Sequence, residues 1–291
     1  MNLFEPTDRY PELVETTYGI HKNWVYYSVI TGFVSIVVVT TLSTSAFLLF
    51  SKSKWSLLKT NMFYWFLMQL MFSSFLISVL NLVFNVPATI MGVSTKHWLP
   101  ADLFYFEEFI RDVLSHSILF ANLEIAIHQI MVFFKLKNAD VQSNLPYIWL
   151  GMVYVFPILI TIALSQYNCT YKYEHFYLKY QLYCHKVVGG FQTMHIKSQW
   201  IQMLEVVIQI VIPIIILGMY VVVVIRIMTM EKSRTNKNEM AIFKQALFIF
   251  VMFQMYNIIT VFGKTVYLEE ITAFYLKRAI QIAQISAGPI I

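Results

Sequence analysis

Long apolar segments recur along the 291-residue chain and are separated by short polar segments. They are rich in Ile, Val, Leu, Phe and Met without strict alternation, which predicts helices and not barrel strands. Each is long enough to cross a bilayer, for which a helix needs roughly 20 residues. Because lipid offers the backbone no hydrogen-bond partners, we expect a helix bundle. The predicted helices span residues 25–50, 60–84, 104–134, 147–166, 201–229, 241–263 and 271–291.

The pattern predicts an all-α membrane protein, a bundle of seven transmembrane helices. Residues 1–24 form a polar segment outside the membrane, and residues 25–291 form the helical domain. The polar lead contains Glu5, Asp8 and Glu12 and differs from the basic start of a signal peptide, so we expect the first apolar segment to be retained as helix one. The sequence ends inside the last apolar segment, and we expect helix seven to be cut short there.

Basic residues follow the first, third and fifth predicted helices. Such basic segments lie preferentially in the cytosol, which places the N-terminus outside the cell. The bias is modest, because the opposite segments also contain lysines, such as Lys96 and Lys172. The formal net charge of +5 is spread along the chain without the concentrated basic face that nucleic-acid binding requires, so we expect no nucleic-acid partner.

The polar segment between the fourth and fifth predicted helices contains both cysteines and the sequon at Asn168. The charge pattern places it outside the cell, where disulfides persist and asparagine is glycosylated. We therefore expect a Cys169–Cys184 disulfide, which closes a loop of about 15 residues and contributes about 3 kcal/mol in the chain-entropy model. Two free thiols are the alternative, and an unused sequon is the alternative to glycosylation of Asn168.

No recognised catalytic or metal-binding motif occurs in the sequence. His175, His185 and His195 share one polar segment, but their regular spacing is not a metal-ligand pattern. We therefore expect neither enzyme activity nor a cofactor.

Ionisable residues inside the third predicted helix are informative because burying them in a membrane is costly. Glu124 and His128 are four residues apart, on one face of the helix. They are candidates for a polar switch and equally for a pair that only satisfies itself. Asp112 and His116 lie near the outer end of the same helix, and for them we expect a pair that only satisfies itself. Helix five contains Pro213, which predicts a kink, and interhelical hydrogen bonds are expected from Gln69, Asn81, Glu205, Gln209, Gln245 and Gln254.

Three sequence segments resemble the nematode serpentine chemoreceptors, most of all serpentine receptor class x. "NCTYKYEHFYLKYQLYC", residues 168–184, is similar to their second extracellular loop. "NEMAIFKQALFIFVMFQ", residues 238–254, resembles the start of their helix six, with Glu239 and Gln245 at the places of its acidic residue and its glutamine. "VFFKLK", residues 132–137, resembles the end of their helix three. The resemblance covers most of the chain by topology, through loose motifs.

The resemblance implies a rhodopsin-like, multi-pass receptor of the plasma membrane that detects a small external molecule and signals to a heterotrimeric G protein. A secondary transporter and a non-signalling bundle are the rival functions, and the transporter predicts internal repeats that the sequence lacks. Candidate switch residues are Glu124, His128, Pro213, Glu239 and Gln245. Candidate G-protein contacts are Lys135, Lys137, Arg226, Lys232, Arg234 and Lys237, with an ordinary basic cytosolic loop as the alternative.

The sequence also departs from that family. Aligned without gaps on "VFFKLK", Ile127 and His128 take the places of the usual Asn-Arg pair, so the arginine that contacts the G protein is missing. The start of helix three has no cysteine to bridge to the extracellular loop. Gly288 precedes Pro289 where an Asn-Pro pair is typical. We therefore expect weak coupling to a G protein.

Overall fold

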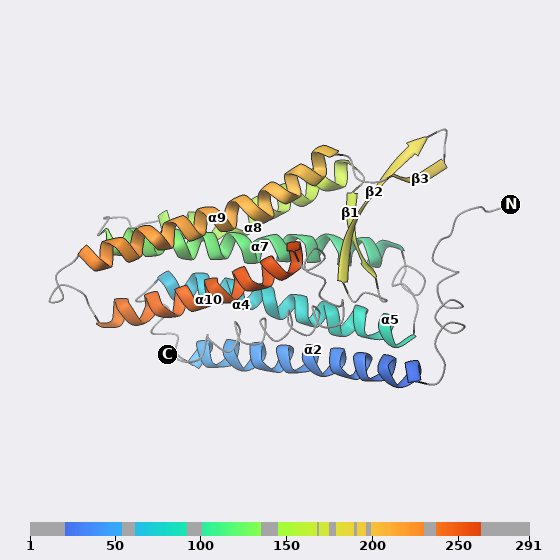
Figure 1. The fold of residues 1–291 in the computed structure, drawn as a ribbon, viewed down its shortest axis with the longest axis horizontal. Coiled ribbons are helices and arrows are strands. Elements are labelled where there is room, and N and C mark those ends of the chain that lie inside the picture. The colour runs from blue at the N-terminus through green and yellow to red at the C-terminus, as the bar shows by residue number, and fades with distance from the viewer. Residues whose placement is uncertain are drawn as a thin grey trace.

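The computed structural model describes residues 21–53, 62–91, 101–134, 145–167, 169–174, 179–188, 191–195, 199–229 and 237–262. These residues form six helical segments that run side by side, with a small sheet at one end (Figure 1). We call the end that carries the sheet the sheet end and the opposite end the far end. Most of the predicted N-terminal segment and the predicted seventh helix, 271–291, lie outside the described residues.

The six predicted helices in this part of the chain are all present. Most extend a few residues beyond the predicted bounds, because helical hydrogen bonding continues past the apolar segment into polar residues such as Lys52. The helices are α2 (His21–Ser53), α4 (Met62–Leu80), α7 (Ala101–Phe133), α8 (Leu145–Gln166), α9 (Gln199–Thr229) and α10 (Lys237–Phe262).

The second predicted helix does not end at residue 84. It continues through a π-helical segment, η1 (Asn81–Asn85), into a short α-helix, α5 (Val86–Met91). In η1 the Val86 N–H donates to the Asn81 carbonyl, five residues earlier. Pro87 explains the change, since proline has no N–H and its ring collides with the carbonyl four residues before it. The wider turn starts a new α-helical segment in which Pro87 occupies the first turn, where proline is tolerated.

A three-stranded antiparallel sheet, absent from the all-α prediction, follows α8. The strands β1 (Cys169–Glu174), β2 (Lys179–Val188) and β3 (Phe191–His195) are in the order β1-β2-β3. In β2, Tyr180, Leu182 and Cys184 alternate with more polar residues, a period that favours a strand. β1 packs against α7 and α8, so the sheet lies across the sheet end of the bundle (Figure 1).

Helix α7 is the centre of the bundle, packed against α4, α8 and α9 and also in contact with α10. An aromatic-rich core cluster surrounds its far half and includes Phe66, Phe133, Tyr220, Phe243 and Phe250.

Large apolar side chains cover the outer face of α9, among them Ile214, Leu217, Val221 and Ile225. A surface of this kind is typical of helices surrounded by lipid. Within the described ranges, four stretches are long and apolar enough to cross a membrane: Gly32–Leu49, Met62–Ala88, Tyr105–Phe133 and Ile210–Thr229. The protein is a multi-pass membrane protein.

Candidate functional site

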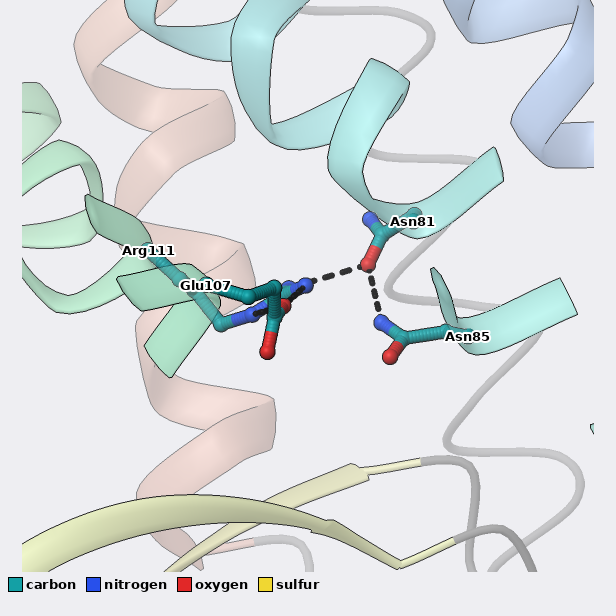
Figure 2. A network of polar contacts seen from close by, with 4 residues as sticks. All are labelled: Asn81, Asn85, Glu107 and Arg111. Atoms are coloured by element: carbon teal, nitrogen blue, oxygen red, sulfur yellow. Dashed lines mark hydrogen bonds and ion pairs between the residues drawn. The ribbon is translucent and has the colours of Figure 1, made fainter. Parts of the chain in front are cut away.

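A buried polar network joins α7 to the π-helical segment of the preceding helix, in the sheet half of the bundle (Figure 2). It consists of Asn81 and Asn85 on η1 and Glu107 and Arg111 on α7, and we call it the Arg111 network. The Arg111 guanidinium donates from Nε to Glu107 Oε1 at 2.7 Å, and its Nη2 also contacts that oxygen. From Nη1 it donates to Asn81 Oδ1 at 3.0 Å. Asn85 Nδ2 donates to the same Asn81 oxygen at 2.6 Å.

Local geometry brings these side chains together. Glu107 and Arg111 are one turn apart on α7, a spacing at which helical side chains meet. Asn81 and Asn85 are also four residues apart, and the wide turns of η1 place them on nearly the same face. Since α4 and α7 pack against each other, Asn81 lies opposite Arg111 across the helix interface.

The network makes a buried arginine tolerable. Arg111 is only 4% exposed and Glu107 2%, inside a helix that is apolar enough to cross a membrane. An unpaired charge there is costly, and a carboxylate with further hydrogen bonds compensates for it. Buried ionisable groups in a membrane helix mark functional sites more often than packing sites, because apolar residues pack at lower cost.

The sequence indicated part of this network. The expectation that Asn81 forms an interhelical hydrogen bond is confirmed by its bond to Arg111. Glu107 was missed, although its position four residues before Arg111 was a usable signal. Asp112 and His116 lie further along α7, and there the His116 Nδ1 contacts the Asp112 backbone carbonyl at 2.8 Å. This contact within the pair is thus to a main-chain atom of Asp112 and not to its carboxylate.

Glu124 and His128 form a second polar group in the far half of α7, and both are buried. Within the described part of the chain, Glu124 Oε2 and His128 Nδ1 have no hydrogen-bond partner, and no ion pair joins the two residues. The His128 ring instead meets the Phe66 ring of α4 edge to face, with 5.8 Å between centroids. The structure thus buries both residues and packs His128 against an aromatic ring of the core, and a switch role stays a prediction.

The other candidate switch residues lie on α9 and α10. Pro213 is buried inside α9, and Gln245 is buried on α10. Glu239 is in the first turn of α10. None of these positions by itself decides between a switch and ordinary packing.

The candidate G-protein contacts that the structure describes lie at the far end. Arg226 is exposed near the end of α9, with its guanidinium carbon 5.4 Å from the centre of the Phe134 ring. Lys237 begins α10. The remaining members of that set, Lys135, Lys137, Lys232 and Arg234, lie outside the described residues.

Cys169 and Cys184 are direct partners in the register of β1 and β2. Opposite residues of an antiparallel pair have Cα atoms about 4.5–5.5 Å apart, within the range that a disulfide spans. The register therefore brings the two cysteines as close together as the predicted disulfide requires. The sequon residue Asn168 lies outside the described residues.

The model of a family described as "Protein of unknown function (DUF621)" matches residues 16–291. The chain belongs to this family. Its description assigns no function, and no curated protein matches the chain. Membership of serpentine receptor class x therefore stays a prediction.

Among solved structures, the chain is similar to squid rhodopsin in its crystal structure. The TM-score is 0.68 at 14% sequence identity, over 90% of this chain and 76% of squid rhodopsin. At this identity the similarity concerns the fold, which is rhodopsin-like.

Proposed function

We propose that the protein is a G-protein-coupled chemosensory receptor of the plasma membrane. It detects a small external molecule at the sheet end and signals to a heterotrimeric G protein at the far end. The observation that carries the proposal is the Arg111 network, a buried set of charged and amide side chains within a rhodopsin-like bundle. Burying these charged side chains in a membrane helix costs more free energy than apolar packing would, which favours a functional site.

The position of the network suits detection of an external molecule. It lies at the end of α7 that carries the sheet, and β1 packs against α7 and α8 at the same end. The basic residues predict that this end is outside the cell. A small molecule that enters between the helices there reaches polar groups on two different helices and can change how those helices sit together.

The far end has features suited to signalling. Aromatic contacts join three helices there: the Phe133 and Phe243 rings of α7 and α10 are 5.5 Å apart, and the Tyr220 and Phe250 rings of α9 and α10 are 4.9 Å apart. Because packed cores are not continuously deformable, movement of α7 requires these rings to repack. The exposed cation Arg226 is at this end and is available to an acidic partner surface.

The resemblance of segments 168–184 and 238–254 to serpentine receptor class x supports a chemosensory role. The direct pairing of Cys169 with Cys184 supports a disulfide that shapes the external sheet. Glycosylation of Asn168 belongs to the same proposal.

The test is G-protein activation by purified protein in lipid nanodiscs. The protein is mixed with each class of Gα subunit plus Gβγ, and nucleotide exchange is followed while a panel of small organic molecules is added. The proposal expects at least one molecule to accelerate exchange by one Gα class, with the protein-free nanodisc as control. Concentration-dependent flux of a panel molecule into sealed vesicles, without exchange, would instead identify a transporter.

A further inference from the structure

The hydrogen bond from Arg111 to Asn81 joins two structural irregularities of the bundle. One is a buried charged pair on α7, and the other is the π-helical segment η1. π-helical turns are rare and occur frequently at functional sites. The bond between these two features holds α7 and the helix that contains η1 in register at this point.

One oxygen atom connects the two features. Asn81 Oδ1 accepts from Arg111 Nη1, across the helix interface, and from Asn85 Nδ2, along its own helix (Figure 2). The first bond is charge-assisted and therefore stronger than a bond between neutral groups. The Asn81 backbone carbonyl meanwhile accepts the π-type bond from Val86. The position of Asn81 therefore depends on α7 as well as on its own helix.

The charged pair keeps Arg111 ready for this contact. Glu107 binds Nε and Nη2 and leaves Nη1 directed at Asn81. Arg111 is compensated by Glu107 on its own helix, so loss of the Asn81 contact does not leave a bare charge in the membrane. Of these two interactions of Arg111, the interhelical bond is therefore the one that opens at the lower cost.

We propose that the Arg111–Asn81 hydrogen bond is a releasable latch between α7 and the π-helical segment η1. Closed, it holds the sheet ends of the two helices at the separation in this structure. Opening it lets α5 and the start of α7 move apart. That an external molecule opens the latch, and that this movement is what the protein senses, rests on the proposed receptor function. The latch itself does not depend on that function.

The experiment measures the distance between two spin labels in nanodiscs. Ile90 on α5 and Leu103 on α7 have exposed side chains near the sheet ends of the two helices, so Ile90→Cys and Leu103→Cys carry the labels. The parent protein without these two substitutions is labelled in parallel and controls for Cys169 and Cys184. Pulsed electron paramagnetic resonance then gives the distance distribution.

Asn81→Ala removes the latch oxygen, and Asn85→Ala is the matched control because it removes the other donor to this oxygen and leaves both atoms of the Arg111–Asn81 bond in place. Losing a hydrogen bond to a charged group raises the ratio of open to closed molecules by about tenfold or more. We expect a second, longer distance in Asn81→Ala and the parent distribution in Asn85→Ala. An unchanged distribution in Asn81→Ala overturns the latch.

A second variant protects the test against misfolding. Arg111→Lys keeps a cation beside Glu107 but lacks the fork that reaches two partners at once. We expect the same longer distance as in Asn81→Ala, and a parent-like distribution in Arg111→Lys also counts against the latch. Nucleotide exchange is measured on the same samples. A lengthened distance with no effect on exchange contradicts the use of the latch in signalling and leaves the latch itself in place, whereas the receptor function fails only if no panel molecule accelerates exchange.

Discussion

Two buried polar groups of α7, the Arg111 network and the Glu124–His128 group, are held in different ways. Near the sheet end, Arg111 and Glu107 are bound to each other, and Arg111 also reaches Asn81 on the neighbouring helix. In the far half, Glu124 and His128 are buried, and in the described part of the chain Glu124 Oε2 and His128 Nδ1 have no hydrogen-bond partner. A satisfied network fixes one arrangement, whereas unsatisfied buried groups gain from a change of arrangement.

This difference indicates where the bundle is held and where it has reason to move. The sheet half is held by a specific contact between α7 and η1. The far half is held by ring packing, such as that of Phe133 with Phe243, which the His128 ring joins through its contact with Phe66. A conformation that brought Glu124 and His128 to water or to a partner would repay part of their burial cost. We therefore expect the far half to rearrange in signalling once the contact in the sheet half is released.

The largest effect is expected from breaking the charged pair. Arg111→Met leaves the Glu107 carboxylate buried and without its cation, which should cost about 3 kcal/mol or more of stability. The double variant Arg111→Met/Glu107→Gln removes both charges and should recover most of this loss, because a buried pair replaced on both sides is nearly neutral. Thermal unfolding in detergent measures both. Equal melting temperatures for the single and double variants would show that the pair does not stabilise the sheet half.

An intermediate effect is expected from the disulfide. Because Cys169 and Cys184 are opposite each other in β1 and β2, mass spectrometry of non-reduced peptides should find them linked. Cys184→Ser should destabilise the sheet by about 3 kcal/mol, seen as faster amide exchange in β1 and β2. Exchange at the far end of α7 is the internal control and should not change. Recovery of both cysteines as alkylated free thiols from surface-expressed protein would exclude the bridge.

The smallest effect is expected at His128. Histidine cannot present a guanidinium fork to a partner, and it is shorter than arginine. His128→Arg should therefore raise G-protein activation several-fold at equal surface expression, since an arginine here can extend its charged group towards the far end while its stem stays buried. His128→Ala tests whether the imidazole itself is needed. If neither variant changes basal or ligand-driven activation, His128 is a packing residue and the switch assignment fails.

The sequence predicted the helices well and the polar contacts poorly, for a physical reason. Residues that face lipid are apolar, so hydropathy predicted the ends of α2, α4 and α7 to within a few residues. The π-helical segment was missed because it depends on Pro87 and on a contact with Arg111 on another helix. No local pattern records such a pairing.

The sheet was missed for another reason. The alternation of Tyr180, Leu182 and Cys184 was present in the sequence but was read only as part of a polar loop. Spacing alone also permitted a Glu124–His128 pair, whereas in the structure the His128 ring packs against Phe66. A four-residue spacing permits a contact and does not enforce it, because the neighbouring helices decide which way each side chain points.

The most direct test of the account asks which end of the bundle is outside the cell. An epitope tag at the N-terminus and, in a second protein, a tag inserted beside Asn236 between α9 and α10 are probed with antibody on intact and on permeabilised cells. If the sheet end senses external molecules and the far end signals in the cytosol, the N-terminal tag is labelled on intact cells and the Asn236 tag only after permeabilisation. The reverse pattern would place the Arg111 network near the cytosol and contradict the proposed function.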